Sequence, residues 1–249
     1  MSTAEHTTTV ALSDIQTYVV NLKRRPDRKL HMQRQLPAAL NATFTSDWTG
    51  PFDGHTLDHR ALKEAGYQLF PWRIPSSNPW WNRPLKYGEI GCTLAHLAVW
   101  RAAIAQSTEF TLILEDDVIL TSDFCNKLTT ALSSPPRPFD LLYLGRFPLE
   151  PDLPLAPGFV VPGYSHCTFG YVLTHQGLTR VLAQHIEHAI VPVDEFLPAM
   201  YIDHPRADLR HRFPKQLQAL ALQPPIVRQL PKGEAGSDTE DSNFVTGSD

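Results

Sequence analysis

Three consecutive acidic residues, Glu115, Asp116 and Asp117, follow an apolar run in the segment LILEDDV. In open α/β sheets ligands bind at the carboxyl ends of strands, and carboxylates gathered there suit a hard divalent cation that holds diphosphate oxygens. Side chains alternate along an extended segment, so we expect Glu115 and Asp117 on the same side of it. The segment therefore favours a metal site, with a solvated acidic turn after a buried strand as the alternative.

A group of basic residues surrounds a predicted helix start in the segment NLKRRPDR, which contains Lys23, Arg24, Arg25 and Arg28. Helix N-termini and guanidinium groups both attract phosphate. Together these residues indicate a phosphate-binding turn, although a solvated charged turn explains any single one of them more simply.

A second helix start is predicted in RPLKYGEIGC, where Lys86 and Glu89 stand on either side of Gly88. Glycine lets the backbone approach a ligand or a strand closely. Gly88 and Gly91 could equally serve helix entry and packing, so this segment supports a ligand site only together with the others.

A further pair of acids, Asp194 and Glu195, lies in the apolar segment VPVDEFLPAM. Acids placed in this way often interact with a helix N-terminus. The functional alternative is a partly desolvated carboxylate that acts as a general base. Among the histidines, only His96 is placed to approach the acidic segment.

These side chains must be positioned by alternating strands and helices. We expect strands at 17–22, 111–114, 140–144 and 169–173, and helices at 26–36, 57–65, 88–106, 123–132, 174–185 and 193–200. The alternation predicts an α/β fold with a mostly parallel central sheet flanked by helices. Residues 66–84 are rich in proline and tryptophan without clear periodicity, which indicates a long loop.

The length of 249 residues is sufficient for one large domain. We expect a disordered N-terminal segment at 1–14, the domain at 15–231, and an acidic mobile tail at 232–249, because the ends are polar. The formal net charge of −4 provides no broad basic field, which argues against nucleic acid as a partner.

The cysteines and the hydropathy bear on location. Cys92, Cys125 and Cys167 are widely spaced and form no CxxC pair, so neither a disulfide framework nor a thiolate zinc site is indicated. The N-terminus lacks the pattern of a secretory signal, and no run reaches the roughly 20 apolar residues that span a bilayer. We expect a cytoplasmic protein that is at most peripheral to a membrane.

Several long segments, in this order, resemble glycosyltransferase family 25, which includes bacterial lipooligosaccharide galactosyltransferases and procollagen galactosyltransferases. The resemblance covers most of the chain. The matching segments are VVNLKRRPDR, FDG at 52–54, RPLKYGEIGCTLAH, LILEDDV, FDLLYLGR, TFGYVLTHQGLTRVL, VDEFLPAMYIDHP and SDTEDS. The terminal SDTE and VDEFLP look more like the procollagen branch.

The resemblance implies a GT-A type fold and a manganese-dependent, inverting transfer of a sugar, with galactose favoured, from a UDP-sugar to a hydroxyl of a glycan, glycolipid or protein. Lipopolysaccharide biosynthesis is one setting for this activity. Glu115 and Asp117 match the metal motif, and Asp194 or Glu195 would face the acceptor. The implied nucleotide-sugar-binding residues are Asn21, Arg25, Asp53, Lys86, Glu89, Asp116 and Ser237.

One departure concerns the metal. Where procollagen relatives carry a histidine in the strand matching 217–222, this sequence has Gln218, whose amide oxygen would bind manganese more weakly than imidazole does. The first alternative function is therefore a non-catalytic nucleotide-sugar-binding protein that retains the fold. A metal-dependent phosphohydrolase is a second alternative, but it usually needs ligands from several strands that we do not find.

Overall fold

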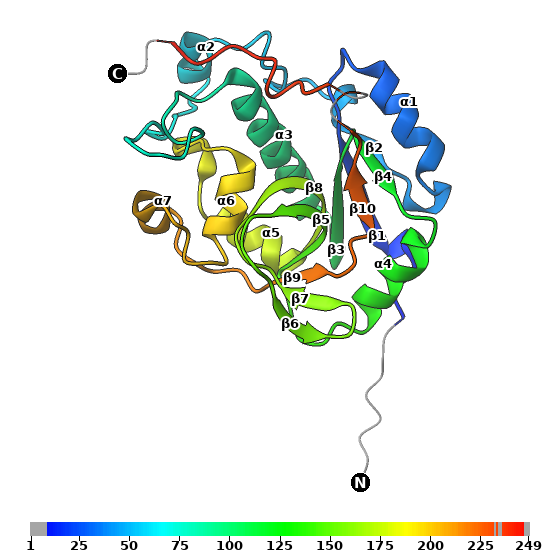
Figure 1. The fold of residues 1–249 in the computed structure, drawn as a ribbon. Coiled ribbons are helices and arrows are strands. Elements are labelled where there is room, and N and C mark those ends of the chain that lie inside the picture. Colours follow the sequence, from blue (N-terminus) through cyan, green and yellow to red (C-terminus); the bar gives the residue numbers. More distant parts are fainter. Residues whose placement is uncertain (1–8, 232, 234–235, 247–249) are drawn as a thin grey trace.

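The computed structural model describes residues 9–231, 233 and 236–246, and a central sheet of eight strands dominates it (Figure 1). The strands of this sheet lie in the order β2-β1-β3-β8-β5-β9-β7-β6. Their bounds are β1 Ile15–Val20, β2 Thr43–Phe44, β3 Phe110–Glu115, β5 Leu141–Pro148, β6 Leu153–Ala156, β7 Phe159–Val161, β8 Ser165–Thr174 and β9 Ala219–Leu222. A separate antiparallel pair joins β4 Val118–Leu120 to β10 Val227–Gln229.

The sheet is mostly parallel, as the sequence predicts. Strands β1, β2, β3, β5 and β9 run in one direction, and β8 and β7 run against them. The carboxyl ends of β1, β3 and β5 therefore lie at one edge of the sheet. This mixed α/β architecture is compatible with a GT-A-like fold.

Helices cover both faces of the sheet (Figure 1). They are α1 Pro26–Gln35, α2 His59–Glu64, α3 Tyr87–Ile104, α4 Phe124–Ser133, α5 His175–Leu182, α6 Val193–Ala199 and α7 Ala207–Arg212. On one face, Ile113 of β3 belongs to the same apolar core as Trp100 of α3. On the other face, Leu114 shares a core with Met32 of α1 and Leu128 of α4. Alternation along β3 thus fixes which side chains face α3.

All the strands and helices expected from the sequence are present, with ends displaced by a few residues. The hairpin β6–β7, the short strands β2, β4 and β10, and helix α7 were not expected. Strand β6 is largely exposed, and Leu153 retains 67% of its accessible surface. Short elements of this kind lack the apolar periodicity on which a sequence-based prediction depends.

Described residues near both ends of the chain contact the domain. Residues 1–8 lie outside the described part of the chain, whereas Val10 donates its backbone NH to Ser133 of α4 at 2.8 Å. Residues 236–246, which we call the C-terminal segment, run along the domain, and Val245 is only 4% exposed. Ion pairs and backbone hydrogen bonds attach this segment to the domain. The rest of the predicted tail, apart from residue 233, lies outside the described residues.

Across the described residues, no helix combines the length and the apolar character that crossing a membrane requires.

Candidate active site

A pocket opens at the carboxyl ends of β1 and β3, where the acidic segment lies. Glu115 is the last residue of β3, and the chain turns at Asp116 and Asp117 before β4 begins. All three acids line the pocket, together with Asn21 from the end of β1 and Gln229 from β10. The structure therefore brings the predicted metal motif to the edge of the sheet where a ligand is expected.

The three acids have different partners. Thr168 of β8 donates its hydroxyl to a Glu115 oxygen at 2.5 Å. Asp116 accepts hydrogen bonds from the Asn21 amide at 2.7 Å and from Arg28 at 2.9 Å, so this acid is largely neutralised by α1. Glu115 and Asp117 are the two acids left without a cationic partner among the described residues.

Asp117 is the acid with an open ligand position. Gln229 donates its amide to Asp117 Oδ2 at 3.0 Å, and Asp117 Oδ1 is buried without a hydrogen-bond partner among the described residues. Asn21 also lines the pocket, and its Oδ1 is likewise buried without a hydrogen-bond partner among the described residues. Leaving buried polar atoms unsatisfied costs free energy, so these oxygens indicate that a ligand completes the pocket.

Burial and the charges of neighbouring acids raise the pKa values of Glu115 and Asp116. Burial, with the charge of Asp117 adding to it, raises the pKa of Glu115 to about 8 against the opposing Thr168 hydrogen bond. Burial raises the pKa of Asp116 to about 6, although the Arg28 charge acts in the opposite direction. A cation bound between Glu115 and Asp117 would favour their ionised forms.

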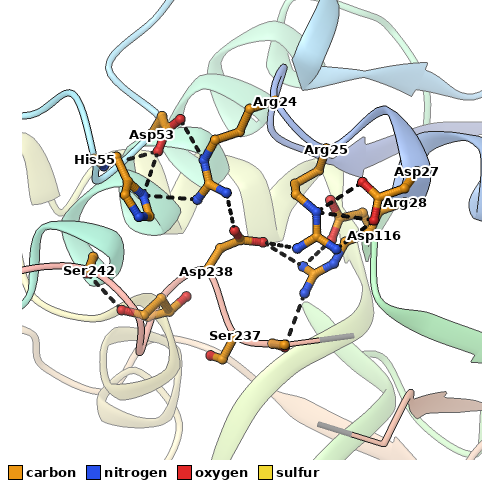
Figure 2. Close-up of polar contacts among 12 residues, drawn as sticks. Arg24, Arg25, Asp27, Arg28, Asp53, His55, Asp116, Ser237, Asp238 and Ser242 are labelled. Atoms are coloured by element: carbon orange, nitrogen blue, oxygen red, sulfur yellow. Dashed lines mark hydrogen bonds and ion pairs between the residues drawn. The ribbon is translucent and has the colours of Figure 1, made fainter. Parts of the chain in front are cut away.

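Three arginines from the predicted phosphate-binding turn meet a single carboxylate, that of Asp238 in the C-terminal segment (Figure 2). Their guanidinium nitrogens lie 2.5 Å (Arg24), 2.6 Å (Arg25) and 3.1 Å (Arg28) from its oxygens. Arg28, Ser237 and Asp238 all line the pocket, and Arg28 is buried. An anion held by three arginines at a helix N-terminus occupies the kind of site that a phosphate would use.

The C-terminal segment also covers the start of α3. Gly88 donates its NH to the Ser242 hydroxyl at 2.8 Å, and a Cβ atom on Gly88 would lie 2.7 Å from the Thr239 carbonyl oxygen. Glycine at this position therefore allows close approach of the segment. The space left in the pocket is about 110 Å³. Pockets for small molecules usually measure about 300–1,000 Å³, so a nucleotide-sugar would require the segment to shift.

The other predicted donor-binding residues lie at the rim or outside the pocket. Asp53 accepts a hydrogen bond from Arg24 at 2.9 Å, and Lys86 pairs with Glu240 of the C-terminal segment at 3.0 Å. Glu89 accepts the backbone NH of Lys86 at 2.7 Å and pairs with Arg83 at 2.6 Å. Glu89 thus caps α3 and holds a neighbouring arginine, and the geometry gives it no direct access to the pocket.

Gln218, predicted as a metal ligand, does not reach this pocket. It precedes β9 and exchanges hydrogen bonds with Asp140, which precedes β5. Because β5 and β9 run parallel to β3, Gln218 lies at the opposite edge of the sheet from Glu115. The residue beside the acids is Gln229 of β10, which the sequence did not reveal because β10 is only three residues long.

The two acids of α6 occupy different environments. Glu195 is 3% exposed and accepts hydrogen bonds from Trp81 at 2.9 Å, Tyr164 at 2.9 Å and His204 at 2.7 Å. Although burial raises its pKa, the hydrogen bonds from histidines lower it to about 2. Both oxygens of Glu195 are therefore engaged, as expected for a carboxylate that holds neighbouring elements together.

Among the described residues, Asp194 accepts one long hydrogen bond, from the backbone NH of Cys167 at 3.4 Å. It does not cap α6, because Pro192 is the residue before the helix and no side-chain cap is formed. Burial raises the pKa of Asp194 to about 6. Its charge also raises the pKa of Glu115, so the two carboxylates lie within electrostatic range of each other. Asp194 is therefore better suited than Glu195 to exchange a proton.

Comparison with known proteins relates the chain to glycosyltransferase family 25. The model of glycosyltransferase family 25 (LPS biosynthesis protein) matches residues 14–148. The inactive glycosyltransferase 25 family member 3 of Homo sapiens is 33% identical over 241 residues, which cover 92% of this chain and 39% of that protein. Human procollagen galactosyltransferase 2 is 33% identical over 240 residues, 91% of this chain and 37% of the relative. The glycosyltransferase 25 family member of Drosophila melanogaster is 34% identical over 239 residues, 92% and 38% of the two chains.

Proposed function

The chain belongs to glycosyltransferase family 25, and on that basis we propose that it transfers a sugar, galactose in preference, from a UDP-sugar to an acceptor hydroxyl with inversion. The observation that supports this most strongly is a pocket lined by Glu115 and Asp117, beside which three arginines converge on Asp238. The name of human procollagen galactosyltransferase 2 supports galactose. The chain spans about two fifths of the length of these relatives, so the acceptor is part of the proposal.

The proposal assigns Glu115 and Asp117 as ligands of a divalent cation, with Mn²⁺ as the preferred ion. The donor set fits, because carboxylate oxygens are ligands that hard cations prefer and Asp117 Oδ1 is buried without a partner among the described residues. When bound, such a cation supplies positive charge that stabilises the departing diphosphate. The amide of Gln229, rather than Gln218, is the one beside this position.

Arg24, Arg25 and Arg28 are assigned to the donor diphosphate. Their guanidinium groups already converge on one carboxylate, that of Asp238, which a diphosphate would displace. Asn21, Ser237 and Asp116 line the same pocket and are assigned to the nucleotide-sugar, with Asp116 acting by holding Asn21 and Arg28. Asp53 and Lys86 are assigned to the rim.

Asp194 is assigned as the general base. It takes the proton from the acceptor hydroxyl, while the oxygen of that hydroxyl bonds to the anomeric carbon of the sugar and the bond to the UDP oxygen breaks. The carboxylate must be ionised to accept this proton, and a pKa of about 6 meets that condition near neutral pH. Glu195 is assigned a structural role, because it accepts hydrogen bonds from Trp81, Tyr164 and His204.

A non-catalytic nucleotide-sugar-binding protein is the second candidate function. The names of several relatives favour it, among them the inactive family member 3 of Homo sapiens and the probable inactive member of Rattus norvegicus. Two observations support catalysis instead: Asp117 Oδ1 is buried without a partner among the described residues, and Asp194 accepts only a long hydrogen bond there.

The acceptor and the location complete the proposal. A hydroxyl of a glycan, glycolipid or protein is the acceptor class, and the link of the family to LPS biosynthesis supports that pathway as one setting. We further propose a reducing compartment such as the cytoplasm. The three thiols of Cys92, Cys125 and Cys167, none of which forms a disulfide, support this location.

A donor screen tests the proposal. UDP-galactose, UDP-glucose and UDP-N-acetylglucosamine are titrated into the protein by calorimetry, each with Mn²⁺ and with a chelator in its place. The expected result is Mn²⁺-dependent binding of all three through their shared UDP, with UDP-galactose tightest. Binding that is equally strong in the chelator would overturn the cation assignment, and absence of UDP binding would overturn the donor assignment.

A further inference from the structure

A second group of potential metal ligands lies between α3 and the end of β3, and it shares Glu115 with the acidic segment. Cys92 and His96 are one helical turn apart on α3, so their side chains share a face of the helix. Glu115 at the end of β3 points toward this face. One ligand atom from each of the three residues lies within 4.8 Å of the other two.

His96 carries the observation that indicates a ligand. The ring is fully buried, and its Nδ1 hydrogen-bonds to the Tyr171 hydroxyl at 2.7 Å. The same hydroxyl accepts a hydrogen bond from Trp100 at 3.0 Å, so the ring orientation is fixed. Nε2 is buried without a hydrogen-bond partner among the described residues. A tautomer that donates from Nδ1 leaves a lone pair at Nε2, which is the form in which histidine binds metals.

We propose that Cys92, His96 and Glu115 form a binding site for a soft divalent cation, with Zn²⁺ as the preferred ion. A thiolate, an imidazole and a carboxylate are the ligands that zinc prefers, and three protein ligands leave the fourth tetrahedral position open. Ligand atoms of a tetrahedral zinc site lie about 3.3–3.8 Å apart. Side-chain rotations that move the three ligand atoms by about 1 Å would therefore assemble the site. The Cys92 thiol releases its proton when the ion binds.

The surroundings of the three ligands match the support that metal sites usually have. The Tyr171 hydroxyl orients His96 through Nδ1, and the Thr168 hydroxyl orients Glu115 at 2.5 Å. Cys92 lines the pocket at the ends of β1 and β3, so an ion can enter through that pocket. Since Glu115 is also assigned to the donor cation, zinc bound here would withdraw that ligand and inhibit transfer. This consequence rests on the proposed function, whereas zinc binding itself does not.

Cobalt(II) tests the site without any assay of activity, because a thiolate ligand gives Co²⁺ an intense near-ultraviolet charge-transfer band. Co²⁺ is added to the full-length protein and then displaced with Zn²⁺. The expected result is a charge-transfer band that saturates at one Co²⁺ per chain and disappears on addition of one equivalent of Zn²⁺. In Cys92→Ser the band should be absent, and in His96→Gln the Co²⁺ affinity should fall at least tenfold.

Two control variants separate this site from the other candidates. Cys125→Ser removes a thiol on α4 and should keep the band. Asp117→Asn removes a ligand assigned to the donor cation alone and should also keep it, even where Mn²⁺-dependent UDP binding is lost. Thermal melting shows that each variant is folded. Absence of the band in the wild-type protein, or its persistence in Cys92→Ser, would overturn the proposal whatever the result of the UDP measurements.

Discussion

The neighbouring acids Asp194 and Glu195 differ more in their surroundings than their adjacent positions suggest. Glu195 accepts hydrogen bonds from Trp81, Tyr164 and His204, whereas Asp194 accepts one of 3.4 Å within the described part of the chain. A carboxylate with both oxygens engaged is a poor proton acceptor, because protonation would break its hydrogen bonds. The assignment of the base to Asp194 follows from this contrast.

Asp194→Asn is therefore expected to lower the turnover rate by about a hundredfold or more, the usual effect of losing a general base. Manganese-dependent UDP affinity should remain near that of the wild type. Glu195→Gln should instead lower the melting temperature, since it disturbs a buried hydrogen-bonded network. Single-turnover rates, calorimetry and thermal melting on both variants distinguish the roles. The assignment fails if the folded Asp194→Asn protein keeps the wild-type rate.

The pKa of Asp194 leads to a separate expectation for the wild-type protein. Burial raises this pKa to about 6, so the ionised base accumulates as the pH rises through that value. We expect kcat/KM to increase with pH up to about 7 and to level off above it. A pH–rate profile that is flat between about pH 5 and 7 would contradict the role of Asp194.

Asp117 and Gln218 form a matched pair for testing the metal assignment. Asp117→Asn should weaken Mn²⁺-dependent UDP binding at least tenfold while the protein stays folded, because Asp117 lies in the turn after β3. Gln218→Ala should leave it unchanged, since Gln218 lies at the opposite edge of the sheet. Calorimetric titration of UDP with Mn²⁺ measures both. Equal effects of the two substitutions would show that Asp117 is not a ligand.

Among the elements, the C-terminal segment (residues 236–246) has the clearest effect on the pocket. Asp238 forms ion pairs with three arginines that the donor diphosphate would bind (Figure 2). Asp238→Asn should raise UDP affinity by about fivefold, which corresponds to about 1 kcal/mol. Asp241→Asn, a substitution at an exposed position of the same segment, should have no effect. A drop in UDP affinity for Asp238→Asn would show that this acid helps to bind the donor.

The elements that the sequence predicted well are those with strong apolar patterns. The burial of β3 could be predicted from LILE, and with it the position of Glu115 at a strand end. Gln218 was misplaced because the sequence alone does not say which end of a strand lies beside the acids. Gln229 and Asp238 were missed because a three-residue strand and a polar terminus carry no periodicity, although both contact the pocket through partners more than 100 residues away.

For the molecule as a whole, the acidic pocket makes stability depend on pH and metal. Burial raises the pKa of Glu115 to about 8 and those of Asp116 and Asp194 to about 6. The folded chain therefore binds more protons at these sites than the unfolded chain does. Their contribution to stability is complete below the unfolded pKa, near 4.5 for Glu115, and is lost as the pH rises to about 8. The lowered pKa of Glu195, about 2, acts only below this window.

The melting temperature of the metal-free protein should accordingly fall between about pH 5 and pH 8. Mn²⁺ should raise it more at the upper end of this range, because the ionised acids are the ligands. Thermal melting across the range, with and without Mn²⁺, measures both effects. In Asp117→Asn the Mn²⁺-dependent increase should shrink. A melting temperature that rises with pH in the metal-free protein would contradict the acidic pocket as described.

The central claim is that the pocket transfers a sugar and does not merely hold a nucleotide-sugar. The most direct measurement is the rate of UDP release from UDP-galactose, with Mn²⁺ present, across a panel of glycan, glycolipid and peptide hydroxyl acceptors. We predict release that requires Mn²⁺, increases with one acceptor class, and falls about a hundredfold in Asp194→Asn. Tight Mn²⁺-dependent UDP binding without release for any donor or acceptor would contradict the claim and favour the non-catalytic alternative.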